Sequence, residues 1–515
     1  MRNCFIALCL FSLWGTPVHA ASPSSVHGAL DAWDVVAAKR HAKRLKAADD
    51  ANGAVALALG RLALMEGRYQ EAVTLLTKAK VNSKDARAAH YLGLARNTWT
   101  ETEKYRDYRT SGGHFLVRYP PGPEALILPY VDDVLERTFD ALTKVFGHTP
   151  PTPIRVEIYP EPEVLAAVSP LTVTEIKTSG TIALCKYNRL MAVSPRALVY
   201  GYGWADTLAH EFIHLLISQK SGNRVPIWLH EGLARYYQER WRSDTQPKLA
   251  RASEHLMAQA IADKELISFE AMSPSMAKLP SQDATALAFA EVFSAIEFMA
   301  KKGGDDVPRQ LVTLMGTGLS DREAVSKVSG LSWSRFEASW KSFIRSQGYR
   351  LQRDGYRERM LFRGENSEGE ELALLKERET RQYTWLGDQL RVKQRHRAAA
   401  KEYAKASKVS KGASPIVQAK LGYALLAIGK PSEAQKAMEK VASVYPSYVL
   451  LQLYLGRAYA MSGAFELARK HLEYGIYLNP FDPEIHGLLA QVYQELGENK
   501  LAERERKVHK ELQRL

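Results

Sequence analysis

One spacing of thirty-four residues recurs towards the end of the chain and limits its fold more than any other feature of the sequence. Each copy has a Leu-Gly pair, a second glycine seven residues later and an alanine five residues after that. The copies are Leu421-Gly422, Gly429 and Ala434, then Leu455-Gly456, Gly463 and Ala468, and in part Leu489, Gly497 and Ala502. A repeat of this length predicts stacked pairs of helices, because one pair cannot bury its apolar face without the next. The small residues predict that the two helices of a pair cross closely.

These copies resemble the tetratricopeptide (TPR) family in period, although the match in residue identity is loose. Leu386-Gly387 with Ala399 supplies a less regular copy, and Leu59-Gly60, Gly67 and Ala72 carry the pattern near the other end of the chain. The resemblance implies all-α arrays that bind protein partners in a concave groove. Packing against the rest of the chain, or pairing of two protomers, is the alternative.

A histidine motif lies between the two repeat segments. The run His210-Glu211-Phe212-Ile213-His214 places two histidines four residues apart. On a helix these histidines lie on one face, so both imidazoles can bind one cation while Glu211 reaches the adjoining water. A catalytic zinc takes three protein ligands and keeps a fourth position for water, so a third donor must come from elsewhere in the fold.

Glu231 is the best third donor. Ser221-Gly222-Asn223 ends the first helix and Pro226 redirects the chain, so a second helix that opens near Trp228 can bring Glu231 back over the histidine pair. His230 competes for the same role, but it projects about a hundred degrees around the helix from Glu231. Two histidines and a glutamate suit zinc, although such a site also accepts other divalent ions.

The surroundings of the motif resemble the gluzincin superfamily and, within it, the bacterial peptidase-MA-like family. The resemblance depends on Thr207-Leu208-Ala209 before the motif and on Trp228-Leu229-His230-Glu231-Gly232-Leu233-Ala234 after it. It implies peptide-bond hydrolysis by a zinc-activated water, with one Zn²⁺ per chain. The implied roles are metal ligation by His210, His214 and Glu231 and general base catalysis by Glu211.

Some positions depart from the family pattern. Phe289 and Glu291 stand where related sequences tend to have tyrosine and glutamine. Arg235 stands where some gluzincins carry an acid that orients a metal-binding histidine. Asp206, one turn before His210, is the substitute that we consider for this orienting role, and an exposed helix residue is the alternative.

Two kinds of substrate contact follow from the resemblance. Gluzincins commonly stabilise the oxyanion with a tyrosine or histidine from a later segment, and Tyr236 and Tyr237 are the candidates, with aromatic packing as the alternative. Gluzincins also pair the substrate backbone with a strand that borders the metal cleft. Leu190-Met191-Ala192-Val193 resembles that strand, with Ala192 as the contact, and an interior strand without a ligand is the alternative.

The predicted fold class is multidomain α+β, with a zincin-like metallopeptidase domain flanked by all-α TPR solenoid segments. In the middle segment, residues 114–119 and 154–159 alternate as strands around a helix at 127–146, and 181–183 and 190–193 form a strand pair, which together predict a small mixed sheet plus helices. The predicted parts are a signal peptide at 1–20, an N-terminal TPR-like helical segment at 26–108, a peptidase domain at 110–347, a linker at 348–384 and a C-terminal TPR array at 385–515.

The start of the chain predicts export. The first twenty residues have a positive start, a short apolar run and Val18-His19-Ala20 at the end, the pattern of a secretory signal peptide. No later stretch reaches about eighteen uninterrupted apolar residues, so we expect no transmembrane anchor. Cys185 is the one cysteine outside this signal, so we expect no disulfide and a buried, unreactive thiol. The expected location is the periplasm of a Gram-negative bacterium.

The net charge of +13 raises the question of a nucleic-acid partner. However, the basic residues are mixed with glutamates along helical segments and form no basic-aromatic module. The densest basic run, at 391–411, is more typical of a solvated helix face than of a binding site. We therefore expect no nucleic-acid partner.

The predicted function is that of an exported zinc-dependent metallopeptidase that hydrolyses a protein or peptide substrate, with TPR arrays that recruit substrate or partner proteins. One alternative is a TPR protein-binding scaffold of the cell envelope whose metallopeptidase domain is vestigial and inactive. A second alternative is a zinc hydrolase that acts on an amide or ester other than protein.

Overall fold

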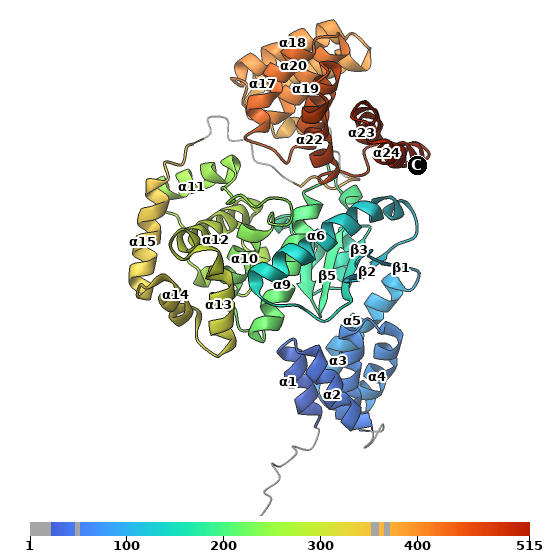
Figure 1. Ribbon diagram of the computed structural model, residues 1–515, viewed down its shortest axis with the longest axis vertical. Coiled ribbons are helices and arrows are strands. Elements are labelled where there is room, and N and C mark those ends of the chain that lie inside the picture. Colours follow the sequence, from blue (N-terminus) through green and yellow to red (C-terminus); the bar gives the residue numbers. More distant parts are fainter. Residues whose placement is uncertain (1–21, 47–51, 352–359, 365–370) are drawn as a thin grey trace, which may run out of the picture.

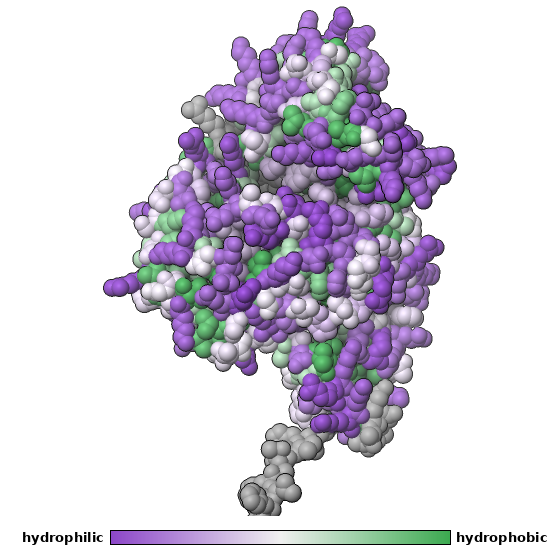
Figure 2. Space-filling model, in the orientation of Figure 1, coloured by the Kyte–Doolittle hydropathy of each residue, from purple (hydrophilic) through white to green (hydrophobic). Residues whose placement is uncertain are grey.

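A computed structural model describes residues 22–46, 52–351, 360–364 and 371–515. The predicted signal peptide at 1–20 lies outside these residues, as does part of the predicted linker. Figure 1 shows three parts along the long axis: helices α1–α5 at one end, a mixed domain in the middle and helices α17–α24 at the other end. Among the described residues, no helix is long and apolar enough to cross a membrane. Figure 2 shows a face that is mostly hydrophilic, with apolar residues scattered over it.

The N-terminal part consists of helices only. They are α1 Pro23–Asp31, α2 Val35–Lys46, α3 Gly53–Met65, α4 Tyr69–Asn82 and α5 Ala86–Thr102. Helices α1 and α2 are separated at Trp33, which takes a left-handed backbone (φ 59°) between them. Helices α3 and α4 cross closely, since a Cβ at Gly60 would lie 2.6 Å from Cγ of Leu76.

The C-terminal part repeats this crossing. Its helices are α17 Arg378–Val392, α18 His396–Val409, α19 Pro415–Ala427, α20 Pro431–Ala442, α21 Val449–Met461, α22 Phe465–Ile476, α23 Pro483–Glu495 and α24 Asn499–Leu512. A glycine on the first helix of a pair meets a large side chain sixteen residues later on the second helix. The pairs are Gly60 with Leu76, Gly387 with Tyr403, Gly422 with Met438 and Gly456 with Leu472. The close crossing predicted from the small residues is confirmed, and the N-terminal hairpin shares it.

The sheet has five strands in the order β1-β2-β3-β5-β4. The strands are β1 Arg106–Arg109, β2 Phe115–Tyr119, β3 Ile154–Tyr159, β4 Ala183–Lys186 and β5 Arg189–Val193. β2, β3 and β5 are parallel, and the two edge strands β1 and β4 run antiparallel to their neighbours. The mixed sheet predicted from the sequence is confirmed, and β1 adds residues upstream of the expected domain start at 110.

Helices cover the sheet and extend the middle domain to one side of it. They are α6 Leu128–Phe146, α7 Pro162–Ala167, α8 Val173–Ser179, α9 Trp204–Ser221, α10 Ile227–Tyr237, α11 Arg251–Asp263, α12 Gln282–Gly303, α13 Val307–Gly316, α14 Asp321–Ser329 and α15 Trp333–Ser346. Phe212 of α9 packs on Phe115 of β2 and Phe139 of α6, with ring centroids 5.5 and 6.1 Å apart. All three rings are buried, so α6 and α9 form one apolar layer on the sheet.

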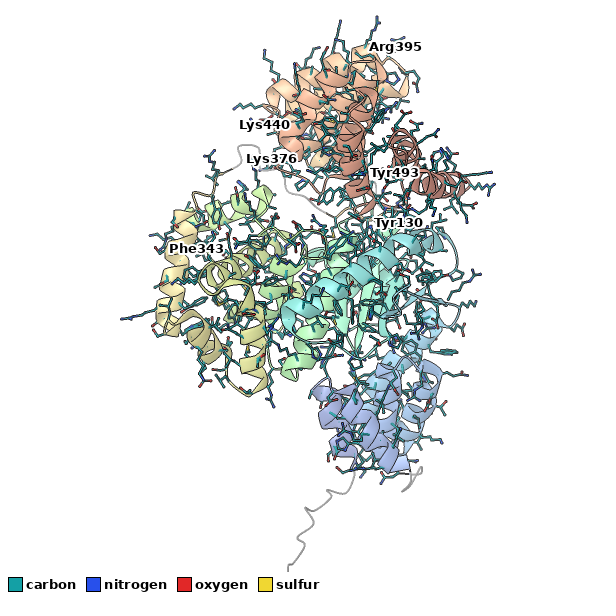
Figure 3. The ribbon with its side chains drawn as sticks, in the orientation of Figure 1. Tyr130, Phe343, Lys376, Arg395, Lys440 and Tyr493 are labelled. Carbon is teal, nitrogen blue, oxygen red and sulfur yellow. The ribbon has the colours of Figure 1, made fainter. Side chains whose placement is uncertain are left out.

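The last TPR helices dock on the middle domain. The Trp204 indole N–H, at the start of α9, donates to the Ile476 carbonyl of α22 at 2.8 Å. Tyr130 of α6 donates to the buried Glu505 of α24 at 2.8 Å, and His486 of α23 lies 2.6 Å from the same carboxylate. Figure 3 shows Tyr130 at this junction, with Tyr493 of α23 above it. Buried polar pairs of this kind fix the orientation of the two parts, because separating them would leave the partners unsatisfied.

A buried charge cluster joins α4 to the sheet. Glu157 of β3 is fully buried and pairs with Arg189 at 3.0 Å and Arg155 at 3.5 Å. The hydroxyls of Tyr69, in the first turn of α4, and of Tyr159 donate to the same carboxylate. Burial raises the pKa of Glu157, but the arginines and tyrosines outweigh it and bring the pKa down to about 2. An ionised carboxylate therefore holds the N-terminal helices to the sheet.

We predict that Glu157→Gln lowers the free energy of unfolding by about 3–5 kcal/mol, because it leaves two buried guanidinium groups without a counter-charge. Denaturant unfolding followed by tryptophan fluorescence measures this loss. Since the folded-state pKa is depressed from 4.5 to about 2, the advantage of the wild type should be present above pH 4.5 and vanish as the pH falls towards 2. Asp133→Asn, which removes an exposed pair with Arg137, should cost no more than about 0.5 kcal/mol. Equal losses in the two variants would contradict the role of the cluster.

Candidate metal centre

Helices α9 and α10 form a hairpin that carries the predicted ligands. Helix α9 ends at Ser221, and both Gly222 (φ 65°) and Asn223 (φ 61°) take a left-handed backbone in the turn. Pro226 is the N-cap residue of α10 and has an extended backbone that redirects the chain. The helix break predicted at 221–223 is confirmed.

Close packing on α12 fixes the rotation of α10. A Cβ at Gly232 would lie 2.9 Å from Ile296 Cγ1 and 3.0 Å from the Val292 carbonyl oxygen. Both contacts are tighter than nearly all contacts that real Cβ atoms make, so glycine at this position allows the two helices to meet. The neighbouring residue Glu231 is thereby directed towards α9.

Three donor groups converge between the two helices. The Glu231 carboxylate oxygen Oε2 lies 3.1 Å from Nε2 of His210 and 3.4 Å from Nε2 of His214. Tetrahedral bonds of about 2.0–2.1 Å to an ion separate the ligand atoms by about 3.3 Å, so these spacings fit one zinc ion. Burial raises the pKa of Glu231, but the adjacent His214 and His210 outweigh it and hold the pKa well below its usual range.

Gln238 orients the first histidine. Its side-chain oxygen Oε1 lies 3.2 Å from Nδ1 of His210, and the side chain is buried at the end of α10. An amide oxygen only accepts hydrogen bonds, so Nδ1 of His210 carries the proton and Nε2 keeps its lone pair for the centre. Such a partner fixes both the tautomer and the ring direction of a metal-binding histidine.

His230 orients the second histidine and does not take the place of Glu231. Its Nδ1 lies 3.1 Å from Nδ1 of His214, on the side of that ring that faces away from Glu231. Burial, with a smaller contribution from His214, lowers the pKa of His230 to about 3. The neutral ring can therefore accept a hydrogen bond from the Nδ1–H of His214, which leaves the lone pair on Nε2 of His214 free. This geometry favours Glu231 over His230 as the third donor.

Glu211 lies beside the converging donors. Donor atoms of His210, Glu211 and His214 lie within 4.8 Å of one another. Glu211 is 6% exposed, the backbone N–H of Cys185 faces its carboxylate, and its Oε2 has no hydrogen-bond partner among the described residues. Burial raises the pKa of Glu211 to about 7. A carboxyl group with a pKa near neutrality can both accept and return a proton.

A cleft of about 860 Å³ opens over the side chains of His210, Glu211, His214 and Glu231. One wall is β4, which is the edge strand of the sheet on this side. The opposite wall includes Phe289 and Phe293 of α12, and Trp33 from the N-terminal helices and Met360 from the predicted linker also line the cleft. The cleft is therefore built by more than the middle domain.

The prediction for Ala192 is wrong. β5 pairs with β3 on one side and β4 on the other, and Ala192 lies between Ile158 and Ala183. Both edges of its strand are used, and Ala192 is buried, so it has no backbone group to offer a substrate. The strand that borders the cleft is β4, because the chain turns back at Tyr187 and adds β4 outside β5.

The predictions for Tyr236 and Tyr237 are also wrong. Both side chains are buried, and Tyr236 packs on Phe293 while Tyr237 packs on Phe146, with ring centroids 5.3 and 5.9 Å apart. Neither tyrosine lines the cleft that contains the histidines. The packing alternative holds, because the face of α10 opposite Glu231 is the core face.

The structure also shows the surroundings of Asp206, Phe289 and Glu291. Asp206 accepts hydrogen bonds from the Trp241 indole at 3.0 Å and pairs with Arg242, so it orients no histidine of the centre. Phe289 lies with its ring centroid 6.2 Å from that of His210 and brings no hydroxyl to the cleft. Glu291 is buried away from the cleft and accepts a hydrogen bond from the Ile267 N–H at 2.9 Å. Burial raises the pKa of Glu291 to about 8.

Sequence reasoning missed the role of Gln238 and the neighbour of Glu211. A signal for Gln238 exists: it follows Glu231 by seven residues, which is two helical turns, so the two lie on one side of α10. For Cys185, the sequence pattern predicted a buried small side chain, and no local signal connects its backbone N–H with Glu211. That contact depends on β4 being the edge strand.

Comparison with known proteins supports two parts of this description. Residues 136–346 match the model of the Peptidase MA superfamily, and residues 425–492 match the model of the tetratricopeptide repeat. No curated protein gives a significant match. Peptidase MA proteins are typically metal-dependent, in agreement with the donor cluster.

Solved structures give only distant likenesses. MamA from Desulfovibrio magneticus is 21% identical with a TM-score of 0.24, over 29% of this chain and 87% of that chain. Native yeast LTA4 hydrolase is 12% identical with a TM-score of 0.34, over 79% of this chain and 66% of that chain. Scores this low do not establish a shared overall fold. By the two family matches, the chain joins a Peptidase MA superfamily domain to tetratricopeptide repeats.

Proposed function

We propose that the chain is an exported zinc-dependent metallopeptidase. The observation that carries this proposal is the spacing of the three donors, in which Glu231 Oε2 lies 3.1 and 3.4 Å from the Nε2 atoms of His210 and His214. This spacing is that of three ligands around one tetrahedral ion. The matched superfamily and the buried Glu211 beside the ligands support the same conclusion.

Each residue has a separate task in the proposed mechanism. His210, His214 and Glu231 would hold the ion, which when bound would supply a water of lowered pKa and polarise the carbonyl under attack. Glu211 would accept a proton at its free Oε2 and return it to the leaving amine. The backbone N–H of Cys185 faces the Glu211 carboxylate and favours its ionised form.

We propose that the substrate backbone lies along β4. The Val193 N–H donates to the Ile182 carbonyl, so the alternation of an antiparallel pair directs the N–H and carbonyl of Ala183 and the carbonyl of Cys185 away from β5, while the Cys185 N–H faces Glu211. These groups lie at the wall of the cleft, where an extended peptide can add as a further strand. An extended backbone along β4 would pass beside Glu211.

The TPR helices and the first twenty residues have proposed roles in recruitment and export. We propose that the TPR helices recruit the substrate or a partner protein, in keeping with the repeats matched at 425–492. The start of the sequence resembles a secretory signal, which supports delivery to the periplasm of a Gram-negative bacterium.

We predict about one zinc per purified chain, measured by elemental analysis after dialysis. His214→Ala should lose the metal, because two ligands cannot hold zinc as three do. His90→Ala, which removes an exposed histidine of α5, should keep it. A wild-type chain that binds no zinc would instead favour the binding scaffold with a vestigial site.

We predict that Glu211→Gln keeps zinc and lowers kcat/KM on casein-derived peptides by at least roughly 10²-fold, the usual contribution of a general base. Since a carboxyl group acts as a base only when ionised, activity should fall as the pH drops below the pKa, which is about 7 without metal. A bound cation favours the ionised form, so the acid limb should have its midpoint at or below pH 7. Unchanged activity in Glu211→Gln would exclude the proposed mechanism.

We predict that Gln238→Leu weakens zinc affinity by roughly 10–100-fold, because Nδ1 of His210 loses the acceptor that fixes its ring. Gln238→Glu keeps an acceptor oxygen of the same reach and should retain the affinity. Competition with a chelator of known zinc affinity measures both. Equal losses in the two variants would contradict the role of Gln238 as the acceptor that orients His210.

A further inference from the structure

We propose that the cleft selects peptides that carry carboxylates. This inference depends on the peptidase function proposed above and names the substrate class of the same site. Its basis is a set of basic side chains that line the cleft around the metal centre and form no ion pair with a carboxylate of the described residues.

Four basic residues line the cleft, and they come from four separate segments. They are Lys186 of β4, Arg235 of α10, Lys248 of the loop before α11, and Lys278 of a short 3-10 helix at Met276–Lys278. All four side chains are exposed. They therefore keep their charge in water without a counter-ion from the protein.

The acidic residues of the cleft do not balance these charges. Two of the three, Glu211 and Glu231, belong to the metal centre, and the third, Glu239, already pairs with Arg242 at 3.0 Å. A bound divalent cation would add further positive charge next to Glu231. The field inside the cleft is therefore positive, and a concave surface with one sign of charge concentrates oppositely charged ligands.

The basic side chains of the cleft differ from many others in the chain. Lys405 pairs with Glu402 and Lys430 pairs with Glu433 along their own helices, as is usual for solvated helix faces. Across the described residues, no carboxylate lies within ion-pair distance of Lys186, Lys248 or Lys278. Arg235 donates to the neutral amide oxygen of Gln238 at 3.3 Å. Charges that stay unpaired inside a substrate cleft indicate that the substrate supplies the partner.

A peptide along β4 would pass these charges in a definite place. Lys186 is the last residue of β4, and the backbone N–H of Cys185 before it faces the Glu211 carboxylate. A side chain of the substrate close to the scissile bond would therefore lie near Lys186. A carboxylate there can come from an acidic side chain or from the C-terminus of a short peptide.

The test is equilibrium binding to the zinc-loaded Glu211→Gln protein, which should bind peptides without cleaving them. The probes are three fluorescent peptides of one length: a glutamate-rich peptide with an amidated C-terminus, its glutamine counterpart, and the same glutamine peptide with a free C-terminus. We expect at least one carboxylate-bearing peptide to bind roughly tenfold tighter than the amidated glutamine peptide at low salt, with the advantage shrinking as salt rises. The first and third probes identify which carboxylate is recognised. Equal affinity of all three peptides would overturn the inference.

A charge-reversal pair tests the origin of the preference. Lys186→Glu combined with Lys278→Glu should abolish the preference for carboxylates, while Lys401→Glu with Lys408→Glu, two exposed lysines of α18, should leave it unchanged. Circular dichroism and zinc content verify that each variant is folded and loaded. A preference that survives the first pair would also overturn the inference.

The two levels of the proposal fail separately. A wild-type enzyme that cleaves neutral and acidic peptides with equal kcat/KM would remove the carboxylate preference and keep the peptidase. A zinc-loaded chain that cleaves no peptide would remove the peptidase, whatever the binding measurements give.

Discussion

The position of one carboxylate between two imidazoles is the constraint on which the rest of the structure depends. Glu231 is held within 3.1–3.4 Å of both histidine Nε2 atoms, although the residues come from separate helices. Charged groups taken out of water require close partners, so a small rotation of either helix would be costly. Two features fix the helices against such a rotation. The left-handed turn at Gly222 ends α9, and the close contact of Gly232 with α12 fixes α10.

Helix α9 also connects the two helical parts of the chain. At its first residue, the Trp204 indole donates to the Ile476 carbonyl of the last repeats. Past its other end, the Asn223 side chain donates to the Asp31 carbonyl of the N-terminal helices at 3.4 Å. The flanking segments therefore hold the helix that carries both histidines, and Trp33 from the N-terminal helices forms part of the cleft wall.

The sequence predicted the features that depend on residues close together in the chain. Four-residue spacing placed His210 and His214 on one helical face, and alternation located the strands, because both depend on residues close in sequence. Strand order depends on contacts between distant segments, so the sequence could not tell that β5 is interior and β4 is the edge, and Ala192 was misplaced. Tyr236 and Tyr237 failed for a similar reason: the partners that bury them, Phe293 and Phe146, come from remote helices.

The sheet has a consequence for how the domain can be divided. The superfamily match begins at residue 136, inside α6, whereas β1 and β2 occupy Arg106–Arg109 and Phe115–Tyr119. A fragment cut at the start of the match would lose two strands and leave β3 with a bare edge. Exposed edges of this kind invite pairing with other chains, so such a fragment should aggregate even though it contains all three proposed metal ligands.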